Sequence, residues 1–338
     1  MRTLTATAAA AVTAAALAGC GNVSVGRHQQ DRSYSAPAGT AGLRITAHGG
    51  RVEITASDSP GIRITERLRW SNEKNKPKAR HVSEGSTLAL SSSCGRNVMG
   101  FAACGVSYRV QVPRGTPVQV DSGDGAIEAS GLAGTVRLRS GSGAIRATDL
   151  RGATASISAG DGSVRVTGRA ATADLHAGTG SVTAENLTAD RLKVRASDGR
   201  VEVSGRVAAA DLGTGTGSIS LDGLAADRLT VRTDDGGITM RLDSPPANVR
   251  ATAGTGSIRL RLPAGESYAI ALSAQGASGS TRPSTRTRGP RGASTCAPAT
   301  ETSPSPRNRS SQSYRTIGHA GVDPPRSFRT VNHGARGQ

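Results

Sequence analysis

Hydrophobic and polar residues alternate along the middle of this chain in a unit of about 18 residues that recurs from Val118 to Leu262. Each unit is centred on a glycine, and the steps between successive glycines are 18, 19, 18, 19, 18, 19 and 20 residues. The glycines are Gly125, Gly143, Gly162, Gly180, Gly199, Gly217, Gly236 and Gly256. Nearly constant steps of this kind are the sequence signature of a repeat protein.

The residues on either side of each glycine predict two short strands per unit. Positions seven and five before the glycine, and two and four after it, are apolar in every unit, as at Val136, Leu138, Ile145 and Ala147 around Gly143. The residues between them are mostly polar, and the position three before the glycine is always Ser, Thr or Ala. Alternation with a period of two places one face of each strand in a core and the other in solvent.

A unit of two five-residue strands cannot bury its own apolar face, but stacked units pair strand on strand at about 4.8 Å. We therefore predict an all-β fold over residues 118–276, a single-stranded β-solenoid with about 18–19 residues and two short strands per coil. The competing all-β fold is a sandwich of hairpins, which would not keep one turn signature at constant spacing. The lack of aromatic residues between Val118 and Leu262 agrees with a narrow interior.

The residue before each glycine alternates strictly between a carboxylate and a hydroxyl: Asp124, Ser142, Asp161, Thr179, Asp198, Thr216, Asp235 and Thr255. If one unit forms one coil, these side chains stack along one edge. The alternation then keeps neighbouring carboxylates about 9.6 Å apart instead of about 4.8 Å. A calcium ladder is the functional alternative, but one Asp per two coils supplies few oxygen ligands. The alternation therefore favours an 18-residue coil without a metal.

The first 20 residues carry the clearest local signal. Arg2 precedes an uncharged stretch rich in Ala and Thr, which ends in Leu17-Ala18-Gly19-Cys20. This ending resembles the lipobox of bacterial lipoproteins. The resemblance implies a signal peptide over residues 1–20, lipidation at Cys20, and a location on the extracytoplasmic face of the cell membrane. Two acyl chains would make that anchoring stable. A plain secretory peptide with a chance cysteine is the alternative.

The region before the repeat differs from it in pattern. Residues 21–40 are polar and predict a tether, whereas the repeat phrase occurs once more around Gly50. Residues 41–117 are therefore expected to hold a first coil and an N-terminal β cap, with strands near 62–64, 87–90 and 106–112. Cys94 and Cys104 flank a Gly-rich segment, and in an exported chain a disulfide between them is favoured over two free thiols.

Residues 277–338 break the repeat in mid-coil. They hold ten arginines, no lysine and two acidic residues, so +8 of the formal net charge of +17 lies here. Rich in Ser, Thr and Pro and without an apolar period, they predict a disordered basic tail. Two explanations of this tail stay open, a shifted reading frame or recent extension, and a basic arm for anionic polymers.

From Thr87 onward the chain resembles the putative-adhesin family of bacterial repeat domains. The resemblance rests on the phrases Ser-Gly-Asp-Gly-Ala-Ile at 122–127 and Ala-Gly-Thr-Gly-Ser-Ile at 253–258. The family name implies surface adhesion and brings no binding residues with it.

No catalytic, cofactor or metal site is predicted. Parallel β-helices host polysaccharide lyases and hydrolases, whose sites need converging carboxylates or bases and long projecting loops. The constant steps leave no room for such loops, and His176, the one histidine of the repeat, is isolated at an outward position. Neither a small-molecule substrate nor a nucleic-acid partner is expected.

Basic residues recur at outward positions on every second coil, namely Arg137/Arg139, Lys193/Arg195 and Arg232/Arg250. They suit an anionic wall polymer, lipid head groups or an envelope protein, and ordinary solubilising charge accounts for them equally well. We expect a lipid-anchored, non-catalytic surface adhesin or interaction scaffold. The alternative is a partner-binding lipoprotein in envelope stress or regulation.

Overall fold

A computed structural model describes residues 28–71, 73–94, 104–263 and 269–274, and within these ranges the chain folds as an all-β solenoid. Its one helical element there is the short 3-10 helix η1 (Glu73–Asn75). No helix in the described ranges is long and apolar enough to span a membrane. The predicted fold class is confirmed. The predicted signal peptide with Cys20 and the predicted tail 277–338 lie outside the described residues.

Each repeat unit forms one coil. Val136 in β10 (Val136–Ser140) lies opposite Val118 in β8 (Val118–Ser122), and Ile145 of the same coil as Val136 lies opposite Ile127 in β9 (Ile127–Ser130), all in parallel register. The segments before the glycines therefore stack as one parallel sheet, the pre-glycine sheet, and those after them as a second, the post-glycine sheet. The further strands are β11 (Ile145–Ala159), β12 (Val164–Ala177), β13 (Val182–Ala196), β14 (Val201–Thr216), β15 (Ile219–Asp235), β16 (Ile238–Leu242), β17 (Asn248–Thr255), β18 (Ile258–Arg261) and β19 (Ala269–Ala274).

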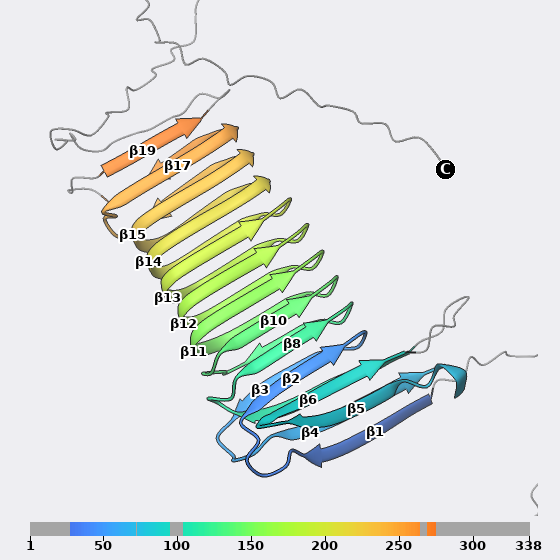
Figure 1. The fold of residues 1–338 in the computed structure, drawn as a ribbon. Coiled ribbons are helices and arrows are strands. Elements are labelled where there is room, and N and C mark those ends of the chain that lie inside the picture. Colours follow the sequence, from blue (N-terminus) through green and yellow to red (C-terminus); the bar gives the residue numbers. More distant parts are fainter. Residues whose placement is uncertain (1–27, 72, 95–103, 264–268, 275–338) are drawn as a thin grey trace, which may run out of the picture. The chain divides into compact units, whose positions relative to one another are not determined.

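In the central coils the two predicted strands join into one. Strands β11 to β15 each run from a post-glycine segment through a corner into the next pre-glycine segment, as Figure 1 shows. Between Gly143 and Gly217, the 19-residue coils turn this corner with Asp149 at a φ of 51° or Asn186 at 50°, whereas the 18-residue coils use Gly168 at 115° or Gly205 at 118°. In these central coils the alternating steps of 18 and 19 residues therefore reflect two alternating corner geometries.

The predicted interior positions are buried throughout the repeat, except Leu260, which is half-buried. The small residue three before each glycine also points inward. Where it is polar, its hydroxyl is satisfied locally, since Ser122 Oγ donates to the Gly125 carbonyl at 3.0 Å and Thr214 Oγ1 to the Gly199 carbonyl at 3.1 Å. The interior therefore leaves these hydroxyls paired.

The repeated glycine is required by the closeness of successive turns. A Cβ built on Gly143 would lie 2.2 Å from the carbonyl oxygen of Gly125, and one on Gly162 would lie 2.2 Å from that of Gly143. The backbone of each turn thus rests directly on the turn before it, with no space for a side chain.

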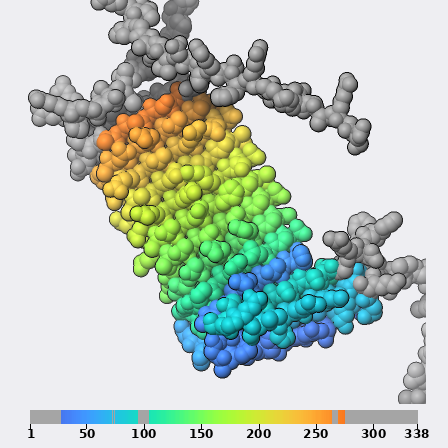
Figure 2. All heavy atoms as spheres, in the orientation of Figure 1, coloured from blue at the N-terminus to red at the C-terminus, as the bar shows by residue number. Residues whose placement is uncertain are grey.

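The first coils do not stack in chain order. Strand β2 (Gly42–Ala47) lies between β6 (Thr87–Ser93) and β8, and β3 (Val52–Ser57) lies between β7 (Cys104–Pro113) and β9. The coil 42–57 is therefore inserted between the coil 87–113 and the coil 118–130, and appears as a blue band between teal and green in Figures 1 and 2. Residues 87–113 were predicted to belong only to a cap, but their strands β6 and β7 form a full coil. The segment that links these two strands is longer than the glycine turn of the other coils.

Antiparallel strands close the stack beside this coil. Strand β4 (Arg63–Trp70) pairs with β7, β5 (Lys78–Glu84) pairs with β6, and β1 (His28–Ser35) pairs with β4. The predicted tether 21–40 is wrong for residues 28–35, because β1 is a polar, exposed edge strand without apolar alternation. Charged and polar edge strands of this kind discourage further strand pairing.

The first prediction concerns the glycine turn. Gly143→Ala should lower the free energy of unfolding by about 1–3 kcal/mol, because the added methyl group meets backbone that cannot give way. Gly115→Ala, where nothing lies within 4 Å of the new Cβ, should change it by less than about 0.5 kcal/mol. Thermal unfolding followed by circular dichroism measures both. Equal stability of the two variants would contradict the close contact between turns.

Candidate binding surfaces

The edge of the glycine turns carries the alternating ladder of carboxylates and hydroxyls. Each hydroxyl donates to the carboxylate of the coil before it: Ser142 to Asp124 at 3.1 Å, Thr179 to Asp161 at 3.4 Å, Thr216 to Asp198 at 2.8 Å and Thr255 to Asp235 at 2.5 Å. Within the described residues no group of three or more His, Cys, Asp or Glu side chains is placed to hold a metal ion. The ladder is thus a chain of hydrogen-bonded pairs along one edge.

The outward face of the pre-glycine sheet carries the basic residues predicted from the sequence. Arg137 and Arg139 are exposed and face Gln119 and Asp121 on one side and serines on the other. Arg195 is bound to Asp211 of the next coil. The predicted pair Arg232/Arg250 is diagonal rather than a row, because Arg250 lies opposite Thr230 and Arg232 opposite Thr252. His176 is exposed between Ser158 and Arg195 on the same face.

The outward face of the post-glycine sheet carries separate clusters of basic and acidic side chains, which the repeat pattern did not predict. Arg146 and Arg165 are exposed and lie opposite each other on neighbouring strands. Further along, a hollow of about 550 Å³ is lined by acidic side chains, among them Glu185, Glu202 and Asp222. At the capped end a second hollow of about 350 Å³ is lined by Arg51, Arg67, Arg69 and Arg109. Clusters of basic and of acidic side chains therefore lie at different places along this face.

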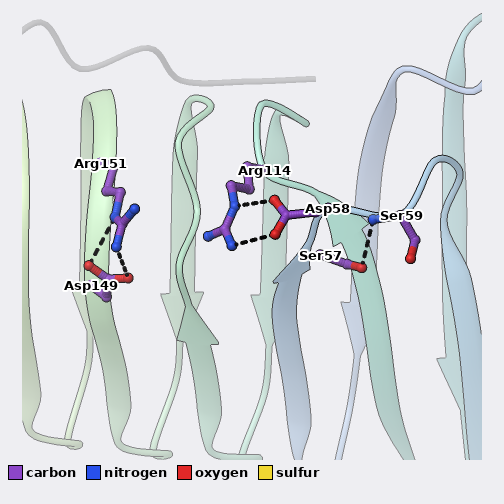
Figure 3. Close-up of polar contacts among 6 residues, drawn as sticks. All are labelled: Ser57, Asp58, Ser59, Arg114, Asp149 and Arg151. Carbon is purple, nitrogen blue, oxygen red and sulfur yellow. Dashed lines mark hydrogen bonds and ion pairs between the residues drawn. The ribbon is translucent and has the colours of Figure 1, made fainter.

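The corner beside the inserted coil is fastened by ion pairs, shown in Figure 3. Arg114, on the connection from β7 to β8, binds Asp58 through two parallel contacts of 2.6 and 3.0 Å. Asp58 directly follows β3, so the pair joins the two chain segments that diverge at this corner. The hydrogen bonds and charge of Arg114 hold the pKa of Asp58 below its usual value. Two coils away, Arg151 binds Asp149 at the same corner.

The capped end holds the predicted disulfide pair and the aromatic residues Tyr34, Trp70 and Tyr108. Cys94 and Cys104 form a disulfide with a Cα–Cα distance of 6.0 Å, at the place where other coils have a glycine turn. Trp70 is buried beneath His28, and the two rings are stacked with their centroids 5.5 Å apart. Cys20, the predicted lipidation site, lies outside the described residues.

A buried carboxylate sits in the same cap. Glu66 is 2 % exposed and accepts a hydrogen bond of 2.6 Å from the Tyr34 hydroxyl. Burial, together with this bond, raises the pKa of Tyr34, and burial raises that of Tyr108 to about 12. Both phenols are therefore neutral at physiological pH. This cluster could not be predicted from sequence spacing, because its members come from separate strands and follow no repeat.

The second prediction follows from the Asp58–Arg114 pair. A carboxylate whose pKa is lowered on folding stabilises the fold above its unfolded pKa of about 4, and loses that contribution as pH falls through the folded pKa. Asp58→Asn should therefore lower the melting temperature at pH 7 and have little effect near pH 2. Asp174→Asn, at an exposed position of the repeat, is the control. A melting-temperature difference that does not change with pH would argue against the pair.

The third prediction tests the ladder. Thr216→Asp would place a carboxylate between Asp198 and Asp235, and repulsion across about 4.8 Å should lower the melting temperature at pH 7 by about 2–4 °C. Thr216→Asn keeps the size and polarity without the charge and should stay close to wild type. The difference between the two variants should vanish below about pH 3, where carboxylates are protonated. A difference that persists in acid would point to a steric cause.

Comparison with known proteins places the chain in a family. The family model described as Toastrack DUF4097 matches residues 41–204 and 169–294. No curated protein matches the sequence. Among solved structures, a putative cell adhesion protein from Clostridium sporogenes ATCC 15579 is 12% identical with a TM-score of 0.32, the match covering 73% of this chain and 100% of the other.

Two further solved structures are similar to the same degree. A putative adhesin from Bacteroides fragilis NCTC 9343 is 15% identical with a TM-score of 0.36, covering 75% of this chain and 95% of the other. A putative lipid binding protein from Parabacteroides distasonis ATCC 8503 is 14% identical with a TM-score of 0.39, and the match covers 75% of this chain and 95% of the other. The resemblance predicted from the glycine phrases is confirmed: this chain belongs to the Toastrack DUF4097 family.

Proposed function

We propose that this protein is a lipid-anchored, non-catalytic module that presents its solenoid at the cell surface as an adhesin or interaction scaffold. The observation that carries the proposal is the pair of continuous outward faces formed by in-register coils. Outward residues hold fixed positions from coil to coil, as Arg137, Ser156 and Asp174 do along one column. Solenoids use such extended surfaces for binding.

The organisation of the charge supports this role. Many of the exposed arginines are held by a neighbouring carboxylate, as Arg195 is by Asp211 and Arg232 by Asp234. Exposed pairs of this kind add little stability, yet they fix where a guanidinium group is presented. A partner with anionic groups would meet these guanidinium groups at fixed positions along the stack.

The anchor is proposed from the sequence at Cys20. The described chain begins with β1, only eight residues after this cysteine, and β1 is an edge strand of the capped end. In a lipoprotein the capped end would then lie next to the membrane, and the other coils would extend beyond it. The expected location is the extracytoplasmic face of the cell membrane.

The experiment has two arms. Metabolic labelling with an alkyne fatty acid should mark the wild-type protein and not Cys20→Ser, and absence of label on wild type would refute the anchor. Affinity capture from envelopes of cells expressing the full chain should recover anionic wall polymer that is released at high salt. Recovery of one stoichiometric envelope protein, unaffected by salt, would favour the regulatory alternative instead.

A further inference from the structure

We propose that the arginine hollow at the capped end, formed by Arg51, Arg67, Arg69 and Arg109, binds the phosphate groups of anionic lipids in the membrane that carries the anchor. The hollow lies on the outward face of β3, β4 and β7 and has a volume of about 350 Å³. The inference rests on the proposed lipid anchor for its location and on the structure for its chemistry.

The strand register explains why the surface is hollowed here. On β7 the residues that face outward at this end are Gly105 and Ser107, which lie opposite Arg69 and Arg67 of β4. Two small residues in the middle strand leave a depression, and long side chains from the strands on both sides rise around it. The arginine hollow is therefore a product of the pairing between the inserted coil, its neighbour and the cap.

The arginines around the depression retain donors for an anion. Arg109 uses Nε for Glu53 at 3.0 Å, and Arg51 uses one Nη for Glu128 at 3.4 Å. Since a guanidinium group carries five N–H donors, both have others free to bind a ligand. No carboxylate among the described residues lies within ion-pair distance of Arg69. Guanidinium groups with unused N–H donors suit phosphate oxygens.

The charge of the lining favours an anion over a cation. Four arginines line the arginine hollow and Glu53 is the one acidic residue of the lining. Asp31, which binds Arg67 through Nε and Nη2, and Glu128 stand outside that lining. Glu53, Asp31 and Glu128 each bind one arginine, so the four arginines outnumber the carboxylates that bind them and the surroundings of the hollow stay positive.

The short distance along the chain from the proposed anchor at Cys20 to β1 favours membrane lipid as the source of the phosphate groups. His28 lies opposite Trp70, next to the pair Gln29 and Arg69. Eight extended residues from Cys20 to His28 span at most about 26–29 Å, and the strands β1, β4, β7 and β3 cover about 15 Å. An anchored molecule thus keeps the arginine hollow within reach of the head groups. Lys76, 5.0 Å from the Trp70 ring, adds positive charge at the same end.

The test uses the full chain with Cys20→Ser, so that binding cannot come from acylation, produced in an oxidising host to form the Cys94–Cys104 disulfide. Co-sedimentation is measured with vesicles of phosphatidylglycerol and phosphatidylcholine in equal parts, and with phosphatidylcholine alone, at about 0.1 M salt. Arg51→Gln/Arg69→Gln is compared with Arg137→Gln/Arg139→Gln, which removes the same charge from the outward face of the opposite sheet.

The expected result is a loss of roughly tenfold in affinity for the anionic vesicles in the first variant, and less than about twofold in the second. Equal losses in both variants would overturn the proposal, since diffuse charge would then explain binding, and so would no loss in either. Wild-type binding to a short soluble glycerol phosphate polymer that depends on Arg51 and Arg69 would reassign the hollow to wall polymer. Unchanged melting temperatures ensure that both variants are folded, and fatty-acid labelling tests the anchor separately.

Discussion

The whole fold depends on the direct contact between the backbones of successive glycine turns. The turn carbonyl of one coil lies so close to the next glycine that a single added carbon would overlap it, as between Gly125 and Gly143. This contact holds the coils in register at the spacing of hydrogen-bonded strands. Register in turn places equivalent residues above one another, so that a narrow interior of Val, Ile, Leu and Ala forms without aromatic residues in the repeat. Shape, core and surface follow from one constraint on the main chain.

The same register governs where charge is tolerated. In a stack of equivalent residues each side chain meets its own counterparts, and a column of identical charges would repel. The ladder avoids this repulsion by placing Thr216 between Asp198 and Asp235. On the faces, arginines find carboxylates on a neighbouring coil, as Arg195 finds Asp211. At the capped end, where four arginines gather around small residues, three of them are matched in the same way and Arg69 has no carboxylate within ion-pair distance among the described residues.

The repeat was fully predictable because its period is carried by residues that touch each other from coil to coil. Leu138 and Ile145 are buried as their spacing requires, and the alternating ladder correctly set one coil per unit. The inserted coil was not predictable, because β2 pairs with strands on both sides that follow much later in the chain, and no local pattern records that order. Strand β1 escaped detection since an exposed edge strand needs no apolar alternation. The arginine hollow depends on these unpredicted pairings, so sequence spacing could not assemble it.

The inserted coil has a consequence for the time course of folding during synthesis. A chain that emerges from its N-terminus presents β2 and β3 first, but their partners β6 to β9 lie as far along as residue 130. These early strands must wait, unpaired, while the cap and the next two coils emerge. The nucleus of the solenoid therefore requires contacts between distant parts of the chain, which slows its formation. Once that nucleus is complete, each later coil needs only the coil before it, and growth proceeds one turn at a time toward the C-terminal coils.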